Sequence, residues 1–404
     1  MTSKRRVLIL TPSLGGGGAE RVTLLLASGL LDRGHAVDIL VRDLVCDYPQ
    51  EVPCGIRLFF LSPGVSTECR ANLEQLPITP QPLIPTSFHF PRLVLGASTS
   101  RNQWSLLMSK NLPRWAIGIA AYIDRECPDA LLAMMTPAVA SATLAVRLAQ
   151  YQVRMTVGVQ HNIFTSKRET HRARKSYPYA DAAVGVSSGV TAELAKLPGM
   201  SSDQLHTIYN PVVSKDLLQK ASETPDHPWF NEPGPPIILA VGRLHEQKDF
   251  PTLLAAFAQL LTRRPARLII LGEGSLRPNL LSLAHNLQVS EHVDFPGFVE
   301  NPFAYLAKAR LFVLSSLYEG LPTVLIEAMA CGCPVVSTDC PHGPDEILEN
   351  GQWGELVPVD NSEVLSAAMI RAIDKPVQRD ALRERAAFFN VERAVDSYED
   401  LLLG

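Results

Sequence analysis

Short apolar runs typical of strands alternate with helical patterns along most of this chain of 404 residues. Such alternation is typical of parallel sheets covered by helices on both faces. The sequence therefore predicts an α/β protein. In the first half the expected strands are residues 7–11, 36–41, 56–61, 131–135, 154–159 and 182–186, and the expected helices are 20–33, 104–125 and 137–150.

The pattern begins again after Asn210-Pro211, and a chain of this length fits two domains. Five prolines within residues 214–236 indicate a linker. Further strands are expected at 237–241, 267–271, 311–314, 334–337 and 355–358, and helices at 250–262, 276–288, 323–331, 380–388 and 391–402. We predict a Rossmann-like domain at 1–212 with a proline-rich insertion at 62–103, a linker at 213–236, a second Rossmann-like domain at 237–380, and terminal helices at 381–404 that pack back on the first domain.

The apolar content predicts neither a membrane span nor a signal peptide. The longest uncharged apolar stretch, residues 130–146, is shorter than the ~20 residues that a spanning helix needs, and Pro137 interrupts it. The seven cysteines are an odd number without paired metal spacing, which favours free thiols in a reducing compartment. We therefore expect a cytoplasmic protein.

The net charge of −4 is divided unevenly along the chain. Residues 1–200 contain 21 Lys and Arg against 14 Asp and Glu, which gives +7, whereas the remainder contains 16 against 27, which gives −11. A basic N-terminal half favours an anionic partner there, either a membrane surface or a phosphorylated acceptor. A chance surface composition is the alternative interpretation.

Four consecutive glycines, 15–18, follow the first expected strand and precede the helix that begins near Glu20. A glycine-rich turn lets the backbone approach a phosphate and directs the N–H groups of the helix toward it. The spacing differs from the dinucleotide-binding G-x-G-x-x-G pattern, because Glu20 occupies the position of the last glycine. The turn alone is compatible with phosphate binding or with a tight structural turn.

The second domain carries a pair of cations just after its first strand. Gly242 permits a turn, and Arg243 and Lys248 bring two positive charges to the end of that strand. Such a pair suits a pyrophosphate leaving group, although a solvated charged loop would have the same composition.

Two glutamates, Glu319 and Glu327, lie eight residues apart on either side of an expected helix start. Gly320 and Pro322 suit the first turn of that helix. Carboxylates can each accept hydrogen bonds from two sugar hydroxyls, and the N–H groups between them can bind a phosphate. Because Glu327 lies in an otherwise apolar helix, we interpret it as functional and not as a capping or exposed residue.

The run EGLPTVLIEAMACGCPVVSTD, with Glu319 and Glu327 as E-x7-E, resembles the donor-site signature of glycosyltransferase family four. Nearly the whole chain follows the family's order of motifs, apart from residues 62–103 and the linker. The matching motifs are GGGGAER (15–21), YNPV (209–212), VGRLHEQKDF (241–250), LGEG (271–274), FPGFV (295–299) and GPDEIL (343–348).

This resemblance implies a GT-B fold and a retaining, metal-independent transfer of a sugar from a nucleotide-sugar donor, without a cofactor. UDP-hexose or UDP-N-acetylhexosamine is the expected donor. Carried over by position, the implied donor-site residues fall into four groups. Arg243 and Lys248, with the backbone of Gly15, Gly16 and Gly17, neutralise the pyrophosphate; Glu327 binds the ribose; Glu319, Gly320 and Leu321 face the sugar and phosphate; Gly272, Gly274, Phe298 and Val299 border the base.

His161 follows an expected strand of the first domain, at a place where the family often has a histidine. The resemblance implies that it hydrogen-bonds the sugar and helps to organise the transition state, together with Glu319, Arg243 and Lys248. The departing phosphate then assists a same-face mechanism, with the two cations stabilising the leaving group.

The acceptor is expected to bind the N-terminal domain. A basic cluster follows His161, and bacterial transferases that act on lipid-linked or surface polysaccharides resemble this chain in the GPDEIL region. We therefore expect a glycan or a lipid-diphosphate-linked saccharide as the acceptor, peripheral contact with the anionic inner face of the cell membrane, and no nucleic-acid partner. The cluster comprises Lys167, Arg168, Arg172, Arg174 and Lys175.

Three other classes remain open from the residues alone. A nucleotide-sugar 2-epimerase shares the architecture, but it is not expected to carry E-x7-E with this Arg and Lys pair. A dinucleotide oxidoreductase would need an acidic residue such as Asp43 or Asp47 to bind a ribose. A catalytically silent partner subunit is disfavoured by the intact glutamates and cations.

Overall fold

The computed structural model describes residues 4–15, 17–46, 49–62, 76–83, 114–160, 164, 166–375 and 378–404. The chain forms two compact units, which we describe separately. Unit 1 comprises Met1–Val186, Val190–Ile208 and Ala394–Gly404, and unit 2 comprises Ser187–Gly189 and Tyr209–Arg393.

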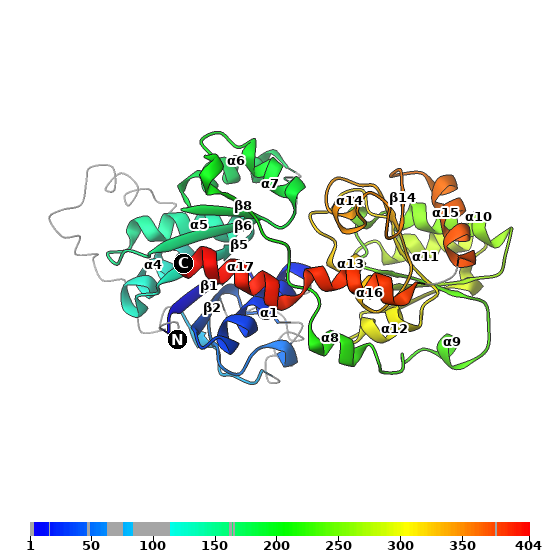
Figure 1. The fold of residues 1–404 in the computed structure, drawn as a ribbon, viewed down its shortest axis with the longest axis horizontal. Helices are drawn as coiled ribbons and strands as arrows, with labels where there is room; N and C mark the ends of the chain where they lie inside the picture. Colours follow the sequence, from blue (N-terminus) through cyan, green and yellow to red (C-terminus); the bar gives the residue numbers. More distant parts are fainter. Residues whose placement is uncertain are drawn as a thin grey trace. The chain divides into compact units, whose positions relative to one another are not determined.

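Unit 1 is built on a parallel sheet of eight strands in the order β4-β3-β2-β1-β5-β6-β7-β8 (Figure 1). The central strands are buried on both faces, which explains their continuous apolar sequences. The strands are β1 (Arg6–Thr11), β2 (Ala36–Asp43), β3 (Arg57–Ser62), β4 (Gln81–Pro82), β5 (Ala130–Met134), β6 (Met155–Gln160), β7 (Ala182–Gly185) and β8 (Leu205–Thr207).

Helices connect the strands of unit 1. The glycine-rich turn ends at Gly17, which is the N-cap of the first helix. The helices are α1 (Gly18–Asp32), α4 (Arg114–Glu126), α5 (Met135–Leu148), α6 (Lys167–Arg174) and α7 (Ser188–Ala195), and the last helix of the chain, α17 (Val391–Leu403), joins this unit from Ala394 onward.

Unit 2 is built on a parallel sheet of six strands in the order β11-β10-β9-β12-β13-β14. The order reverses direction between β9 and β12, and ligands of such sheets bind at the carboxyl ends of the strands near this point. The strands are β9 (Ile237–Val241), β10 (Arg267–Leu271), β11 (Val293–Gly297), β12 (Leu311–Leu314), β13 (Val335–Thr338) and β14 (Glu355–Val357).

The helices of unit 2 bury an apolar core against this sheet. Phe257 of α10 and Met369 of α15 are fully buried within it. The helices are α8 (Lys215–Lys220), α9 (Pro228–Asn231), α10 (Phe250–Leu261), α11 (Arg277–Asn286), α12 (Pro302–Lys308), α13 (Thr323–Ala330), α14 (Pro344–Ile347), α15 (Ser362–Asp374) and α16 (Arg379–Ala386).

The predicted architecture of two parallel sheets with covering helices is confirmed. Several details differ. Residues 213–236, predicted as a linker, belong to unit 2 and contain α8 and α9. They are hydrogen-bonded to the rest of that unit, for example through Tyr305 Oη, which donates to the Asp226 carbonyl at 2.8 Å. The helix expected at 104–125 is observed from Arg114, and its residues 104–113 lie outside the described part of the chain.

The last helix of the chain packs within unit 1. Tyr398 of α17 is buried, and Val395 lies directly against Gly29 of α1. Glu399 accepts a hydrogen bond from His35 at 3.0 Å and forms an ion pair with Arg33 at 2.5 Å. Of the terminal helices predicted at 381–404 to pack on the first domain, only the part from Ala394 onward belongs to unit 1, whereas α16 and the residues up to Arg393 belong to unit 2.

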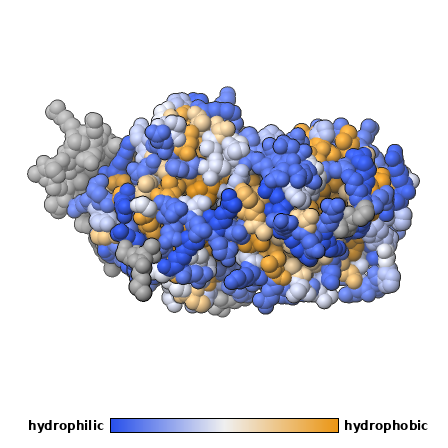
Figure 2. Space-filling view, viewed as in Figure 1, coloured by the Kyte–Doolittle hydropathy of each residue, from blue (hydrophilic) through white to orange (hydrophobic). Residues whose placement is uncertain are grey.

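None of the described helices combines the length and the apolar character that crossing a bilayer requires. Figure 2 shows that hydrophilic residues predominate on the face in view, with apolar residues in smaller groups between them. Tyr179 is one of the large apolar side chains that remain exposed, and Arg147 lies over its ring with the guanidinium carbon 4.0 Å from the ring centroid.

Candidate active site

Glycines bring the backbones close together at the carboxyl ends of β9, β10 and β11. Gly272 has a φ of +128°, and a Cβ atom at this position would collide with the carbonyl oxygen of Gly242. At Gly274 a side chain would meet the Leu244 carbonyl, and Gly297 has a φ of +92°. The predicted donor-site glycines 272 and 274 are therefore needed for close approach of neighbouring strand ends, whatever ligand binds beside them.

The loop after β9 carries the two predicted cations, of which one is exposed and the other is ion-paired. Arg243 is exposed, and its guanidinium forms no hydrogen bond or ion pair with the other described residues. Lys248 ends a short helix, η4 (Glu246–Lys248), and its ammonium lies 2.6 Å from Oε1 of Glu319. Asp249 then adopts a left-handed conformation, with a φ of +45°, and caps α10. Arg243 is thus available to an anion, whereas Lys248 is held in place.

Glu319 lies at the centre of a polar network after β12. Its side chain is 8% exposed. Oε1 accepts hydrogen bonds from Lys248 Nζ and from Ser316 Oγ, both at 2.6 Å, and Oε2 accepts a longer one, at 3.4 Å, from Gln247 Nε2. The backbone N–H of Glu319 donates to the Pro341 carbonyl at 2.7 Å. Lys248 and Glu319, which are 71 residues apart in sequence, therefore form one unit.

The start of α13 follows this network. Pro322 is its N-cap residue, and Gly320 and Leu321 precede it. Gly343 has a φ of +95° and lies against the Gly320 carbonyl and Leu321, so a larger residue there would displace this turn. Glu327 lies one helical turn further on and is 8% exposed. The predicted donor-site residues 319, 320, 321 and 327 are thus brought together around one helix N-terminus, where an anion is favoured.

The predicted base-binding pair lies just beyond β11. Phe298 is 50% exposed and Val299 is partly exposed. A half-exposed aromatic ring beside the glycine-lined strand ends provides an apolar surface on which a planar base can stack.

The predicted site residues of unit 1 are only partly described. Gly15 and Gly17 flank the turn before α1, and Leu14 holds it by donating its N–H to the Val45 carbonyl at 2.9 Å. Gly16 and His161 lie outside the described residues. Asp47 also lies outside them.

Asp43, the other acidic residue considered for ribose binding, forms an ion pair with the neighbouring Arg42 at 2.7 Å. A surface ion pair between neighbours gives no support to a dinucleotide site.

The basic cluster of unit 1 is carried by α6 and the residue after it. Ser166 caps the helix by accepting from the Glu169 N–H at 3.1 Å. Five cations of this segment are exposed and form no ion pair with other described residues. They are Lys167, Arg168, Arg172, Arg174 and Lys175.

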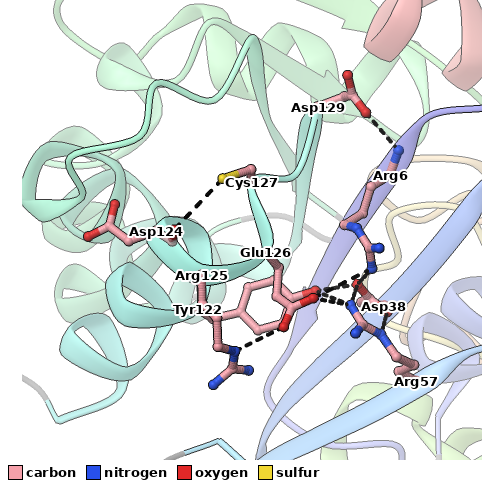
Figure 3. Close-up of polar contacts among 9 residues, drawn as sticks. All are labelled: Arg6, Asp38, Arg57, Tyr122, Asp124, Arg125, Glu126, Cys127 and Asp129. Carbon is pink, nitrogen blue, oxygen red and sulfur yellow. Dashed lines mark hydrogen bonds and ion pairs between the residues drawn. The ribbon is translucent and has the colours of Figure 1, made fainter.

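A second charged cluster of unit 1 lies at the amino ends of the strands (Figure 3). Asp38 of β2 is buried and accepts hydrogen bonds from Arg57 at 2.7 Å, from Arg6 at 2.9 Å and from the Tyr122 hydroxyl. Burial acts to raise the pKa of Asp38, but these donors together hold it below its ordinary value. Because Asp38 and its partners lie at the amino ends of the strands, we interpret this cluster as structural.

Several residues of the network carried no recognised role in the sequence. Ser315 donates to the Lys248 carbonyl at 2.7 Å, and Thr338 donates to the Ser316 carbonyl at 2.6 Å. Outside this network, Tyr209 of the YNPV motif donates a hydrogen bond to Glu346 of the GPDEIL motif at 3.0 Å. Ser315 and Ser316 follow a strand of a parallel sheet, where ligands bind, and this position was the sequence signal that could have marked them as site residues.

Among the described residues, no three His, Cys, Asp or Glu side chains gather as a metal site. Cys331 and Cys340 are buried, and burial raises the pKa of each thiol to about 12. Thiols of this kind remain protonated and unreactive at neutral pH.

Two family models match the chain in succession. The model of Glycosyltransferase Family 4 matches residues 16–215, and the model of Glycosyl transferases group 1 matches residues 223–388. The second match covers the cations of the 243–248 loop and both glutamates around α13.

Similar proteins include transferases of bacterial glycans. The N-acetylgalactosamine-N,N'-diacetylbacillosaminyl-diphospho-undecaprenol 4-alpha-N-acetylgalactosaminyltransferase of Campylobacter jejuni is 35% identical over 56% of this chain and 61% of its own length. The lipopolysaccharide core biosynthesis glycosyltransferase LpsE of Rhizobium meliloti is 36% identical over 41% of this chain and 49% of its own length. The chain thus spans about half to three fifths of the length of these relatives.

A solved structure of the Anabaena protein HepE, in complex with UDP and glucose, has a similar fold. Its TM-score is 0.71 at 19% identity, and the match covers 98% of this chain and 99% of the other. At this identity the likeness shows the fold alone.

Proposed function

Because the chain belongs to glycosyltransferase family 4 and has the GT-B fold, we propose that it transfers a sugar from a nucleotide-sugar donor to a glycan or lipid-linked saccharide. The observation that carries this proposal is the Lys248–Glu319 pair beside the N-terminus of α13. A cation, a carboxylate and free helix N–H groups there match a diphosphate attached to a sugar.

The proposed donor is UDP-hexose or UDP-N-acetylhexosamine. Arg243 and Lys248 neutralise the diphosphate, and the glycine turn of unit 1 contributes backbone N–H groups. Glu327 binds the ribose hydroxyls, and Phe298 borders the base. The complex of HepE with UDP and glucose and the transferase named for N-acetylgalactosamine support this choice.

We propose a retaining reaction without a metal ion. The bond between the anomeric carbon and the phosphate oxygen breaks, and the departing diphosphate keeps the electron pair. The acceptor hydroxyl attacks the same face and passes its proton to a departing phosphate oxygen. Arg243 and Lys248 stabilise the charge that develops on the leaving group, and His161 hydrogen-bonds the sugar.

The proposed acceptor is a lipid-diphosphate-linked saccharide at the inner face of the cell membrane. Five exposed cations around α6, which form no ion pair within the described part of the chain, suit either a diphosphate or anionic lipid headgroups. The Campylobacter relative bears the name of a diphospho-undecaprenol-linked acceptor. The enzyme would then work in the cytoplasm, without a nucleic-acid partner.

A donor panel tests this function. Purified protein is incubated with UDP-, GDP- and ADP-sugars in turn, with and without undecaprenyl-diphosphate-linked saccharides, and nucleotide release is measured. We expect release from a UDP-sugar that depends on the acceptor. Formation of a C2-epimeric sugar, with no dependence on an acceptor, would instead identify a nucleotide-sugar 2-epimerase and refute the proposal.

A further inference from the structure

We propose that Ser316 and Gln247 are positioning residues that fix the Glu319 carboxylate in one orientation, so that Oε2 faces the hydroxyls of the transferred sugar. This inference rests on the proposed function, because it assigns a task to the same donor site. Neither residue belongs to the E-x7-E signature.

The two oxygens of Glu319 have unequal environments. Oε1 accepts two short hydrogen bonds, from Lys248 and Ser316, whereas Oε2 accepts the single longer one from Gln247. A carboxylate oxygen accepts about two hydrogen bonds in the plane of the group. Oε1 is therefore satisfied by the protein, and Oε2 retains the capacity to accept from a substrate hydroxyl.

Ser316 is placed so that its hydroxyl has little freedom. It is fully buried two residues after the end of β12, and its carbonyl accepts from Thr338 of β13 at 2.6 Å. The sheet therefore fixes the backbone that carries the Ser316 side chain. Because the sheet holds this hydroxyl in place, its hydrogen bond can orient Glu319 even when Lys248 shifts toward a diphosphate.

Gln247 connects the cation loop to the carboxylate loop. Its side-chain amide donates to the Tyr318 carbonyl at 2.9 Å as well as to Glu319, and its backbone carbonyl accepts from the Leu317 N–H at 2.8 Å. These contacts keep residues 317–319 beside Lys248, so that the sugar end and the phosphate end of the donor site stay in register.

This arrangement predicts that different residues bind the two parts of the nucleotide-sugar donor. The nucleoside diphosphate is held by Arg243, Lys248, Glu327 and the α13 N-terminus, whereas the sugar depends on Glu319. Removing the Ser316 hydroxyl frees the carboxylate to rotate and should affect the sugar alone. A hydrogen bond to a charged group contributes roughly 1.5 kcal/mol or more, which corresponds to about a tenfold change.

The experiment compares Ser316→Ala and Gln247→Leu with wild type. Calorimetry measures the Kd of UDP, UDP-glucose and UDP-N-acetylgalactosamine, and kinetics measures kcat and KM with the donor that the wild type uses. Ser366→Ala, which changes a buried serine of α15 in the same unit, is the matched control. We expect both variants to bind UDP within twofold of wild type and to lose about tenfold in kcat/KM, and the control to change neither.

A double-mutant cycle shows whether Ser316 acts through Glu319. If it does, Ser316→Ala should have little further effect on kcat/KM in a Glu319→Ala background, because the oriented group is already gone. Wild-type kinetics in both single variants, an equal loss of UDP and UDP-sugar affinity, or full additivity in the cycle would overturn the inference while leaving the proposed function intact. Wild-type protein that neither binds UDP nor releases it from any donor would remove the proposed function, and the inference with it.

Discussion

At the scale of single residues, the described donor-site side chains differ in how they are held. Arg243 is exposed and unpaired among the described residues, Lys248 is paired with Glu319, and Glu327 is buried in α13. Substituting each of them should therefore have a different consequence, although all are expected to contact the same donor.

Lys248→Ala should reduce turnover by about 10²-fold, because one contact to the developing charge of the leaving group is lost. The change also leaves the buried Glu319 without its cation, so the melting temperature should be measured alongside acceptor-dependent nucleotide release. Lys308→Ala, at an exposed lysine of α12, provides the control. Near-normal turnover in a folded Lys248→Ala protein would refute its role.

Glu327→Ala should weaken donor binding more than it slows the chemical step. A ribose contact is equally strong in the ground state and in the transition state, so its loss raises KM and leaves kcat largely unchanged. The Kd of UDP should rise in parallel with KM. A fall in kcat at an unchanged KM would instead place Glu327 at the reacting centre.

At the scale of elements, regular alternation made most strands and helices predictable, and the exceptions have local causes. Strands β9, β10 and β12 begin and end at the predicted residues. Strand β11 was missed because Pro296 and Gly297 interrupt its apolar pattern. Helix α15 was missed although Asn361 supplies an N-cap signal before its apolar residues.

Helix α6 carries the predicted membrane-binding charge. Replacing Arg168, Arg172 and Lys175 together by alanine should reduce co-sedimentation with anionic liposomes at low salt, because each cation near the surface contributes about 1 kcal/mol. Replacing three exposed cations of unit 2 by alanine removes the same net charge and is the control; these are Lys215, Arg263 and Lys308. Absence of liposome binding by the wild-type protein, or an equal loss in both variants, would contradict a membrane role for α6.

The Asp38 cluster should make the packing of β1 to β3 sensitive to acid. The native pKa of Asp38 is lowered, so its stabilising effect is complete above the ordinary carboxyl pKa of about 4 and is lost as the pH falls from there through the lower native value. Asp38→Asn should remove this acid-dependent loss. At neutral pH it should destabilise unit 1 by about 3 kcal/mol, the lower end for a broken buried pair, because Arg57 is 38% exposed.

Hydrogen exchange of peptides from β1 to β3, measured between pH 3 and 7 and corrected for intrinsic rates, checks this expectation. Peptides from β9 and β12 in unit 2 serve as the internal control. An Asp38→Asn protein that keeps the wild-type dependence on pH in β1 to β3 would show that another group is responsible.

At the scale of the whole molecule, the sequence predicted a set of donor-site residues but not how these residues hold one another. Motif order located Lys248 and Glu319, whereas their ion pair depends on the approach of loops 71 residues apart. Gln247 lies within the VGRLHEQKDF motif and Ser316 lies shortly after β12, but the sequence did not show that both contact Glu319, since that contact depends on the tertiary positions of the loops after β9 and β12. Only a folded sheet brings such residues together.

The chain also returns to its first unit at its end, which links the stability of unit 1 to the last residues of the sequence. Tyr398 of α17 is 1% exposed, and its hydroxyl has no hydrogen-bond partner among the described residues. Tyr398→Ala should therefore destabilise unit 1 by roughly 3 kcal/mol or more, as expected when a buried aromatic side chain is deleted. Tyr398→Phe should be neutral or slightly stabilising, because it removes an unpaired buried hydroxyl and keeps the ring.

Hydrogen exchange separates this effect from general unfolding. In Tyr398→Ala, peptides of α1 should exchange faster, since Val395 of α17 packs against Gly29, whereas peptides of α10 and α15 should keep their wild-type rates. Equal acceleration in both units would mean that α17 stabilises the chain as a whole. Unchanged exchange in α1 would mean that α17 contributes little to the stability of unit 1, because deleting a buried ring of α17 would not have loosened the helix against which α17 packs.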